Sequence, residues 1–380
     1  MKKHLIAPGP TPISPETLSA LARPAIHHRG PAFKEIYARV QDKLKWIFQT
    51  EGEVLSITCS GTGSFEAVFS NFTRQGDTVL CIGGGKFSER WSEMASSMDL
   101  KVLDLEVAWG EVVNIDALKT VLDANEKVGM VTMCASETSS GVYHPIKEVA
   151  RLLADYPSTL LAVDGITAVG VHDIRMDDWG VDIVISGSQK AFSLPPGLAF
   201  IAARKSVWPL IENSDHRRYY FDLRKEIKKA PSHQTAFTPA SSLIVALDSV
   251  LSGMVEEGRE ALFNRHEELS RATIAGIKAL GCSLFPTVPS HAVTALRVPD
   301  GVNAPDVVKT MLERYQVTVA GGQESLKPFL IRIGHMGYAD FSDVLIALSA
   351  LERALNDNGY RTEIGAGLVA AQAVFRGEEI

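Results

Sequence analysis

The chain is predicted to be an α/β protein with a mainly parallel sheet and a smaller C-terminal α+β domain. Between residues 77 and 205, short apolar runs alternate with helix-like segments, which is typical of strands joined by helical crossovers. The runs consist almost entirely of Val, Ile, Leu and other small apolar residues, as expected for strands buried on both faces. After residue 280 the order becomes strand, helix, strand, strand and helix, which indicates a second architecture.

Six of these runs are predicted as strands of the large sheet: DTVLCIGG, KVLDLEV, VGMVTMCAS, TLLAVDGIT, VDIVISGS and LAFIAAR. A helix is expected from Pro145 to Tyr156, where apolar residues recur on one helical face. Two longer helices are expected between residues 240 and 280, where strand signals are absent. The second of them, from about Gly258 to Leu280, is predicted to connect the two domains.

The C-terminal domain is predicted to contain the strands HAVTALRV, VTVAG and FLIRIG and helices over residues 304–315 and 341–358. Near the other end, Ser14 and Pro15 have the pattern of an N-cap and first helical position. We therefore expect an N-terminal segment 1–20 that packs with the small domain, a large domain 21–255, a connecting helix 256–280 and a small domain 281–380. The tail 361–380 is assigned no role.

Composition narrows the function. With 38 Lys and Arg against 45 Asp and Glu, the formal charge is -7, and no long basic run occurs, so nucleic acid and anionic membranes are not expected partners. The apolar run before Pro8 is too short for a signal peptide, and no stretch of 18 apolar residues suggests a membrane span. Four cysteines lack metal-binding spacing, so no metal is expected, and they are predicted to be reduced and buried in a cytoplasmic protein: Cys59, Cys81, Cys134 and Cys282.

Two strand ends carry side chains suited to catalysis, because ligands of open α/β sheets collect at the carboxyl ends of the strands. Lys190 follows the run VDIVIS, where partial desolvation would lower its pKa and make it nucleophilic. Asp164 ends the run TLLAV and could pair with a pyridinium N–H. Taken alone, the motif around Lys190 favours an ordinary surface lysine, and Asp164 could equally be a turn former or a helix N-cap. The occurrence of both residues at strand ends favours the catalytic explanation.

A third candidate is the segment CSGTGSFEA, which is small and polar and then becomes helix-like. The amino end of such a helix is a natural anion site. Gly61 and Gly63 do not complete a dinucleotide fingerprint, because position 66 is Glu. A bare helix-capping turn is the alternative.

The motifs together resemble the class V aminotransferases, and specifically the alanine or serine:glyoxylate (pyruvate) branch of the fold-type-I enzymes that use pyridoxal 5'-phosphate (PLP). The resemblance runs nearly end to end through APGPTP, HHRGPAF, SGTGSFEA, GGGKFSERW, ASETSSGV, AVDGITAVG, SGSQKAF, HQTAFTP and LIRIGHMG. It implies a seven-stranded sheet in the large, PLP-binding domain and a homodimer with shared active sites.

The resemblance also implies roles for individual residues. Lys190 would form the Schiff base with PLP, and Asp164 would pair with the pyridine nitrogen. The phosphate would be held by the SGTG segment and by the residue before the lysine. The implied cofactor contacts are Ser60, Gly61, Thr62, Phe87 stacked on the ring, Thr138 near the phenolic oxygen, Asp164, Gln189, Lys190, and Thr235 reaching the phosphate of the neighbouring subunit.

Two further residues match substrate-binding positions of the family. Arg332 lies within the apolar strand FLIRIG, where a guanidinium must be paired, so either a structural salt bridge or a clamp on a substrate carboxylate would explain it. Gly9, in the PGP turn, matches a backbone segment that lines the substrate pocket, although Pro8 and Pro10 suit a simple turn as well. A polar pair, His28 and Arg29, is left outside the catalytic set.

The predicted function is transfer of an amino group from serine or alanine to glyoxylate or pyruvate by ping-pong chemistry. Aspartate as the donor is an alternative. A cysteine desulfurase-like lyase is less favoured, because Gln189 rather than His precedes the lysine and no cysteine follows Cys282. A phosphonate aminotransferase is less favoured because Arg332 suits a carboxylate.

Overall fold

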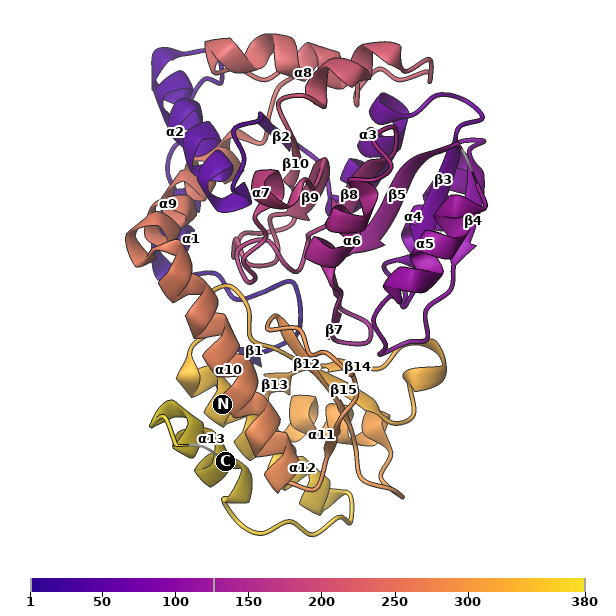
Figure 1. Cartoon of the computed structure of the whole chain (residues 1–380). Coiled ribbons are helices and arrows are strands. Elements are labelled where there is room, and N and C mark those ends of the chain that lie inside the picture. The colour runs from indigo at the N-terminus through magenta and orange to yellow at the C-terminus, as the bar shows by residue number, and fades with distance from the viewer. Residues whose placement is uncertain (1, 126, 379–380) are drawn as a thin grey trace.

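The computed structural model describes residues 2–125 and 127–378. A large part is built on a seven-stranded sheet, and a small part is built on a four-stranded antiparallel sheet (Figure 1). Two long helices, α9 (Ser241–Glu257) and α10 (Arg259–Ala279), run along one side of the molecule from the large part to the small part. The predicted α/β class and the seven-stranded sheet are confirmed.

The large sheet has the strand order β2-β10-β9-β8-β5-β3-β4. Its strands are β2 (Val54–Ile57), β3 (Thr78–Ile82), β4 (Lys101–Leu105), β5 (Val128–Cys134), β8 (Leu160–Asp164), β9 (Ile183–Gly187) and β10 (Ala199–Ala203). β10 runs antiparallel to both of its neighbours, β2 and β9, whereas the other strand pairs of this sheet are parallel. The segment 188–198 that joins β9 to β10 contains no crossover helix, so the chain returns antiparallel. The six predicted strands are all present, and the seventh, β2, was missed because it is only four residues long.

Helices cover both faces of this sheet. Met130 and Ala162 belong to one buried cluster, whereas Val131 and Val163 belong to another, so successive residues of β5 and β8 point to opposite faces. The helices of the large part are α2 (Pro31–Phe48), α3 (Gly61–Phe72), α4 (Glu89–Ser97), α5 (Ile115–Asp123), α6 (Ile146–Leu153), α7 (Met176–Trp179) and α8 (Leu223–Lys229). The central strands are therefore buried on both faces, whereas the edge strand β4 stays partly exposed.

The small part has its own buried cluster of hydrophobic residues. Its antiparallel sheet has the order β11-β12-β15-β14, formed by β11 (Ser283–Leu284), β12 (Val293–Arg297), β14 (Ala320–Gly321) and β15 (Leu330–Gly334). The helices are α11 (Ala304–Tyr315), α12 (Phe341–Asp357) and α13 (Ala366–Phe375). The run VTVAG was predicted as one strand, but it divides between β13 (Val317–Thr318) and β14.

The N-terminal segment joins the small part. Strand β1 (His4–Leu5) pairs in parallel with β13, and α1 (Pro15–Leu21) then packs against α9. Ser14 caps α1, because its side chain accepts a hydrogen bond from Thr17 N. A hairpin of β6 (Ser136–Glu137) and β7 (Val142–Tyr143) projects from the large part toward the small sheet (Figure 1). The proposed domain boundaries at residues 20, 255 and 280 stay predictions.

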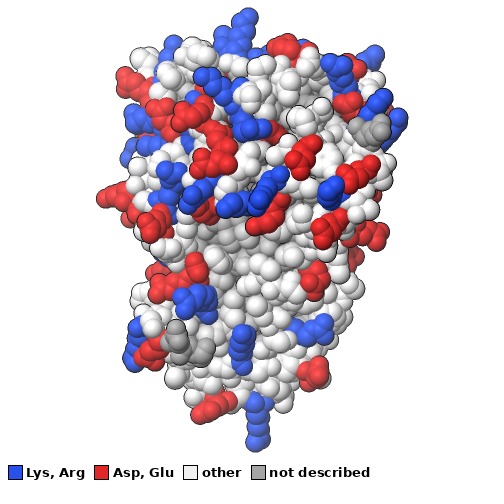
Figure 2. Space-filling model, viewed as in Figure 1, with Lys and Arg blue, Asp and Glu red and all other residues white. Residues whose placement is uncertain are grey.

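The four cysteines are free thiols. Cys81, Cys134 and Cys282 are buried as expected, but Cys59 is only half-buried, because it lies in the open turn before α3. No helix among the described residues is long and apolar enough to cross a membrane. Charged side chains of both signs intermingle on the face drawn in Figure 2, and a largely uncharged band crosses its middle.

Candidate active site

Lys190 lies three residues past the end of β9, in the turn that follows the buried strand. Its Nζ donates a hydrogen bond to Pro8 O at 2.5 Å. Burial lowers the lysine pKa to about 8, and the positive charges of Arg332 and Arg90 act in the same direction, while Asp164 opposes them. A substantial fraction of the amine is therefore unprotonated near neutral pH, as a nucleophile requires.

Asp164 is the last residue of β8, the strand next to β9 in the sheet. Its carboxylate accepts hydrogen bonds from Ile166 N at 2.8 Å and from the Cys134 thiol at 3.5 Å. Burial raises the pKa of Asp164 to about 6, although the Ile166 N–H opposes this shift, and the charge of Glu137 adds to it. A cation placed beside this carboxylate would lower its pKa again and be held strongly.

The start of α3 offers a site for an anion. The helix begins at Gly61 after Ser60, whose side chain makes no capping hydrogen bond. Ser60 and Thr62 are exposed, whereas Gly61 is buried, and a Cβ on Gly61 would lie 2.6 Å from Ile166 Cδ1. Amide groups at this helix start can therefore approach a phosphate closely, and the helix dipole favours its charge.

Gln189 immediately precedes Lys190 and is predicted, like the start of α3, to contact the cofactor phosphate. Its side-chain Oε1 is buried and has no hydrogen-bond partner among the described residues. Its backbone carbonyl accepts a hydrogen bond from Thr11 N, so the N-terminal segment fixes this turn. The glycine at Gly61, the side chain of Gln189, and Lys190 and Asp164 at the ends of adjacent strands fit the groups that PLP presents, namely a phosphate, an aldehyde and a pyridine nitrogen.

Phe87 precedes α4, and Arg90 lies in the first turn of that helix. The Arg90 guanidinium lies 5.3 Å from the centre of the Phe87 ring and donates to Thr62 Oγ1 at 3.3 Å. Its charge also acts on Asp164 and Lys190, lowering the pKa of each. Arg90 therefore belongs to the same polar group, although sequence reasoning did not single it out.

Thr138 is buried on the hairpin β6–β7. Thr167 Oγ1 donates to Ser136 O at 2.7 Å, so the 3.1 Å contact between the Thr138 and Thr167 hydroxyls requires Thr138 to donate. The Thr138 carbonyl accepts from Arg332 Nη1 at 3.1 Å. This residue thus connects the large part with the small part.

Arg332 lies in the middle of β15 and is only 6% exposed. Its other hydrogen bond runs from Nε to Gly321 O at 2.9 Å. Burial lowers its pKa to about 10, with the charge of Glu137 opposing the shift. Within residues 2–125 and 127–378 no carboxylate forms an ion pair with this guanidinium, so the structural salt bridge considered from the sequence is absent there.

Gly9 lies against the lysine. A Cβ at this position would collide with Lys190 Nζ and would lie 2.7 Å from Lys190 Cδ, and the φ of +115° favours glycine as well. Thr11 Oγ1 donates to Lys190 O at 2.7 Å. The PGP turn therefore forms a wall of the lysine pocket rather than a remote loop.

Thr235 is held in a different environment. Its hydroxyl donates to Phe237 O at 2.6 Å, and its carbonyl accepts from Arg29 Nη1 at 2.7 Å. Arg29 also donates to Gln234 Oε1 at 3.0 Å. Among the described residues no hydrogen bond links Thr235 to Lys190, Asp164 or Gln189, and Phe237 and Arg29 hold it instead.

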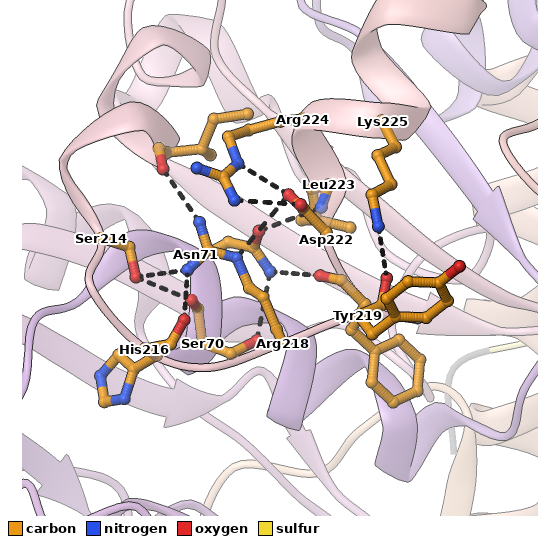
Figure 3. A network of polar contacts seen from close by, with 12 residues as sticks. Ser70, Asn71, Ser214, His216, Arg218, Tyr219, Asp222, Leu223, Arg224 and Lys225 are labelled. Carbon is orange, nitrogen blue, oxygen red and sulfur yellow. Dashed lines mark hydrogen bonds and ion pairs between the residues drawn. The ribbon is translucent and has the colours of Figure 1, made fainter.

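The neighbouring segment 214–225 is anchored to α3 by the polar network drawn in Figure 3. Asn71 donates to Phe221 O at 2.7 Å and accepts from Leu223 N at 3.0 Å. Arg218 donates to Ser214 Oγ at 2.9 Å. The network keeps this segment fixed on the helix whose amino end forms the anion site.

Sequence reasoning also missed Glu137, which is fully buried and lies inside the motif ASETSSGV. A glutamate among small residues at the end of an apolar strand is an unusual pattern that could have drawn attention. Arg90 likewise lies inside the motif GGGKFSERW. Both residues act through contacts that only the folded chain defines.

Comparison with known proteins agrees with the fold. The family model Aminotransferase class-V matches residues 15–346. The chain is 39% identical over 379 residues to a soluble hydrogenase, small subunit, of Synechococcus sp. (strain PCC 6716), covering 98% of each chain. It is 33% identical over 380 residues to an L-aspartate–glyoxylate aminotransferase of Paracoccus denitrificans (strain Pd 1222), covering 98% of this chain and 96% of that one.

Among solved structures, the ureidoglycine–glyoxylate aminotransferase of Bacillus subtilis superposes with a TM-score of 0.92 at 28% identity, covering 99% of this chain and 98% of the other. The hydrogenase name belongs to the Synechococcus protein, and no activity is carried over from it. The chain belongs to the class-V aminotransferase family, and within that family it is an aminotransferase of PLP fold type I.

Proposed function

We propose that this aminotransferase transfers the amino group of a small α-amino acid, serine or alanine, to a small 2-oxo acid, glyoxylate or pyruvate. The single observation that supports this most is the position of Lys190 and Asp164 at the ends of adjacent strands, with Arg332 joined to the same pocket through Thr138. The Lys190 amine suits the aldehyde of the cofactor, and the Asp164 carboxylate suits its ring nitrogen. The Arg332 guanidinium suits a substrate carboxylate.

When bound, PLP would supply a reactive aldehyde and an electron-withdrawing ring, and the site residues would do the rest. Lys190 Nζ would hold the cofactor between turnovers. Released by the substrate, Nζ would take the proton from the substrate Cα and return it on the cofactor side. The pKa of about 8 keeps this amine close to the proton affinity that such transfer needs.

Asp164 would accept a hydrogen bond from the protonated ring nitrogen and so keep the ring electron-poor. Arg332 would bind the α-carboxylate shared by every amino donor and oxo acceptor, and it would orient the Cα hydrogen toward Lys190. Because both half-reactions use the same carboxylate, one arginine suffices for a ping-pong exchange.

Aspartate is the second candidate donor, and a specific observation favours it. Arg90 is a second guanidinium near the pocket, held at Thr62 and Phe87 without an ion-pair partner among the described residues. A distal carboxylate could approach it. The Paracoccus relative is an aspartate–glyoxylate enzyme, which is consistent with this alternative.

The test is a donor screen with the purified protein and PLP. Serine and aspartate would each be mixed separately with glyoxylate and with pyruvate, and glycine or alanine formation followed. Alanine would be mixed with glyoxylate alone, because alanine and pyruvate only exchange into each other. We expect serine or alanine with glyoxylate to give the highest kcat/KM. A clear preference for aspartate would replace the proposed donor, and inactivity with all three donors would contradict the proposal.

Two further aspects belong to the proposal. We infer a homodimer in which Thr235, displayed on the loop that Arg29 holds, reaches the phosphate site of the second subunit. The free thiols of all four cysteines support a reducing, cytoplasmic location. Sedimentation of the purified protein would test the dimer.

A further inference from the structure

Glu137 is a carboxylate with no exposed surface, yet it has no cation among its described hydrogen-bond partners. Four donors surround it instead. Oε1 accepts from Phe87 N at 3.3 Å, Ser139 N at 3.1 Å and Ser139 Oγ at 2.6 Å, and Oε2 accepts from Ser88 N at 2.8 Å. Burying a carboxyl group is costly unless it is hydrogen-bonded, and these four donors satisfy it.

These bonds join two segments that lie far apart in the chain. Phe87 and Ser88 precede α4, whereas Ser139 lies in the turn of the β6–β7 hairpin. The close approach also requires Gly85, because a Cβ there would collide with the Glu137 carboxyl group and with Ser139 Oγ. Glu137 therefore links the two segments, together with Lys86 N, which donates to Ser139 Oγ at 3.0 Å.

Each segment carries a residue of the proposed site. The first presents the Phe87 ring, which Arg90 covers at 5.3 Å. The second presents the Thr138 carbonyl, which accepts from Arg332 Nη1 at 3.1 Å. Moving the hairpin turn would therefore move the anchor of the guanidinium, while moving the first segment would shift the aromatic ring.

We propose that Glu137 is a positioning residue that fixes Phe87 and Arg332 relative to each other, the latter through the Thr138 carbonyl. The cofactor ring at Phe87 and the substrate carboxylate at Arg332 are then bound in one fixed geometry. Glu137 touches neither substrate nor cofactor in this role. The kinetic consequences of this role rest on the proposed function, whereas the hydrogen bonds that link the two segments do not depend on it.

Glu137→Gln is the sharpest variant, because it keeps the size of the side chain. Its single carbonyl oxygen can face either Ser88 N or the Phe87 and Ser139 donors, and the amide NH₂ then opposes at least one N–H. The control is Glu352→Gln, a buried glutamate in α12 that accepts only from Gly365 N among its described partners. Gly85→Ala displaces the Glu137 carboxyl group without changing its charge and should act like Glu137→Gln.

The first readout is amide hydrogen exchange of the protein without cofactor. In Glu137→Gln and Gly85→Ala we expect exchange at Phe87, Ser88 and Ser139 to accelerate roughly tenfold or more. Glu352→Gln should leave these amides unchanged. Unchanged exchange at either segment in Glu137→Gln would overturn the proposal, whatever the activity of the wild type.

The second readout is steady-state kinetics of the PLP-loaded enzyme. Glu137→Gln should raise KM for both amino donor and oxo acceptor about tenfold, with a smaller change in kcat. Combined with Arg332→Lys, it should add little, because both changes act on the same guanidinium. Unaltered KM values, or effects that multiply in the double variant, would overturn the role. An inactive wild type would count against the proposed function alone.

Discussion

The proposed site has two walls, one from the large part and one from the small part, and they are built in different ways. On one wall, Lys190 and Asp164 follow neighbouring strands of a buried, mainly parallel sheet. On the other, Arg332 lies in the middle of an antiparallel strand of the small part and donates a hydrogen bond to the Thr138 carbonyl of the large part. Under the proposed function, the first wall would hold the cofactor and move protons through Lys190, and the second would bind the substrate carboxylate through Arg332.

This difference shows that the residues of the first wall are positioned by one sheet, whereas the residue of the second is positioned by the contact between two parts of the molecule. Adjacent parallel strands place their carboxyl ends together whatever else the chain does, so the lysine and the aspartate are brought together by one sheet. Arg332 depends instead on how two parts of the molecule meet. Changes at the sheet edge should therefore lower kcat, whereas changes at the small part should raise KM.

The largest effect is expected for Asp164→Asn. Loss of the charge beside the cofactor ring should lower kcat about a thousandfold, within the usual range for an acid–base group. Burial raises the pKa of Asp164 from 3.8 to about 6, so its contribution to stability is full below pH 3.8 and is lost as the pH rises through 6.

The cofactor-free Asp164→Asn variant should consequently be more stable than wild type at pH 8, by up to about 3 kcal/mol. Near pH 4 the two proteins should converge. Urea unfolding at both pH values measures the difference. A variant that is destabilised equally at both would show that the ionised carboxylate is not costly to bury.

The next effect concerns Arg332, which should act on binding. Arg332→Lys keeps the charge but cannot grip a carboxylate with two parallel hydrogen bonds, so KM for donor and acceptor should rise roughly a hundredfold, equivalent to about 2–3 kcal/mol. Arg332→Met, which preserves packing without charge, should bind more weakly still. If kcat falls while both KM values stay unchanged, Arg332 does not act on substrate binding and the proposed difference between the two walls is wrong.

A smaller effect is expected for Gly9→Ala, which narrows the pocket from the N-terminal segment. The added Cβ would press on Lys190 and should lower kcat about tenfold. Gly76→Ala is the matched control, because Gly76 also has a positive φ, of +77°, but nothing lies within 4 Å of its Cβ position. Gly9→Ala should lose activity, whereas Gly76→Ala should keep it; equal activity in the two would remove Gly9 from the site.

The sequence could predict the first wall better than the second. Continuous apolar runs marked β3, β5, β8 and β9, and their carboxyl ends pointed to Lys190 and Asp164. The short β2 and the antiparallel direction of β10 escaped, because a four-residue strand has little pattern and strand direction depends on the connection.

Contacts between distant segments could not be predicted in the same way. Glu137 binds Ser88, and Arg29 holds the carbonyl of Thr235, through hydrogen bonds that no local pattern encodes. Arg332 was expected to require a partner, and its partners proved to be the carbonyls of Gly321 and Thr138. The roles assigned to these residues in binding cofactor and substrate remain predictions.

The central claim is that Lys190 holds the cofactor, and covalent trapping tests it most directly. Wild type and Lys190→Ala would be incubated with PLP, reduced with borohydride, digested and analysed by mass spectrometry. We predict one cofactor-labelled peptide containing Lys190 in the wild type, removed by serine or alanine before reduction, and no specific label in the variant. Specific labelling of a different lysine, or an unlabelled wild type, would contradict the account.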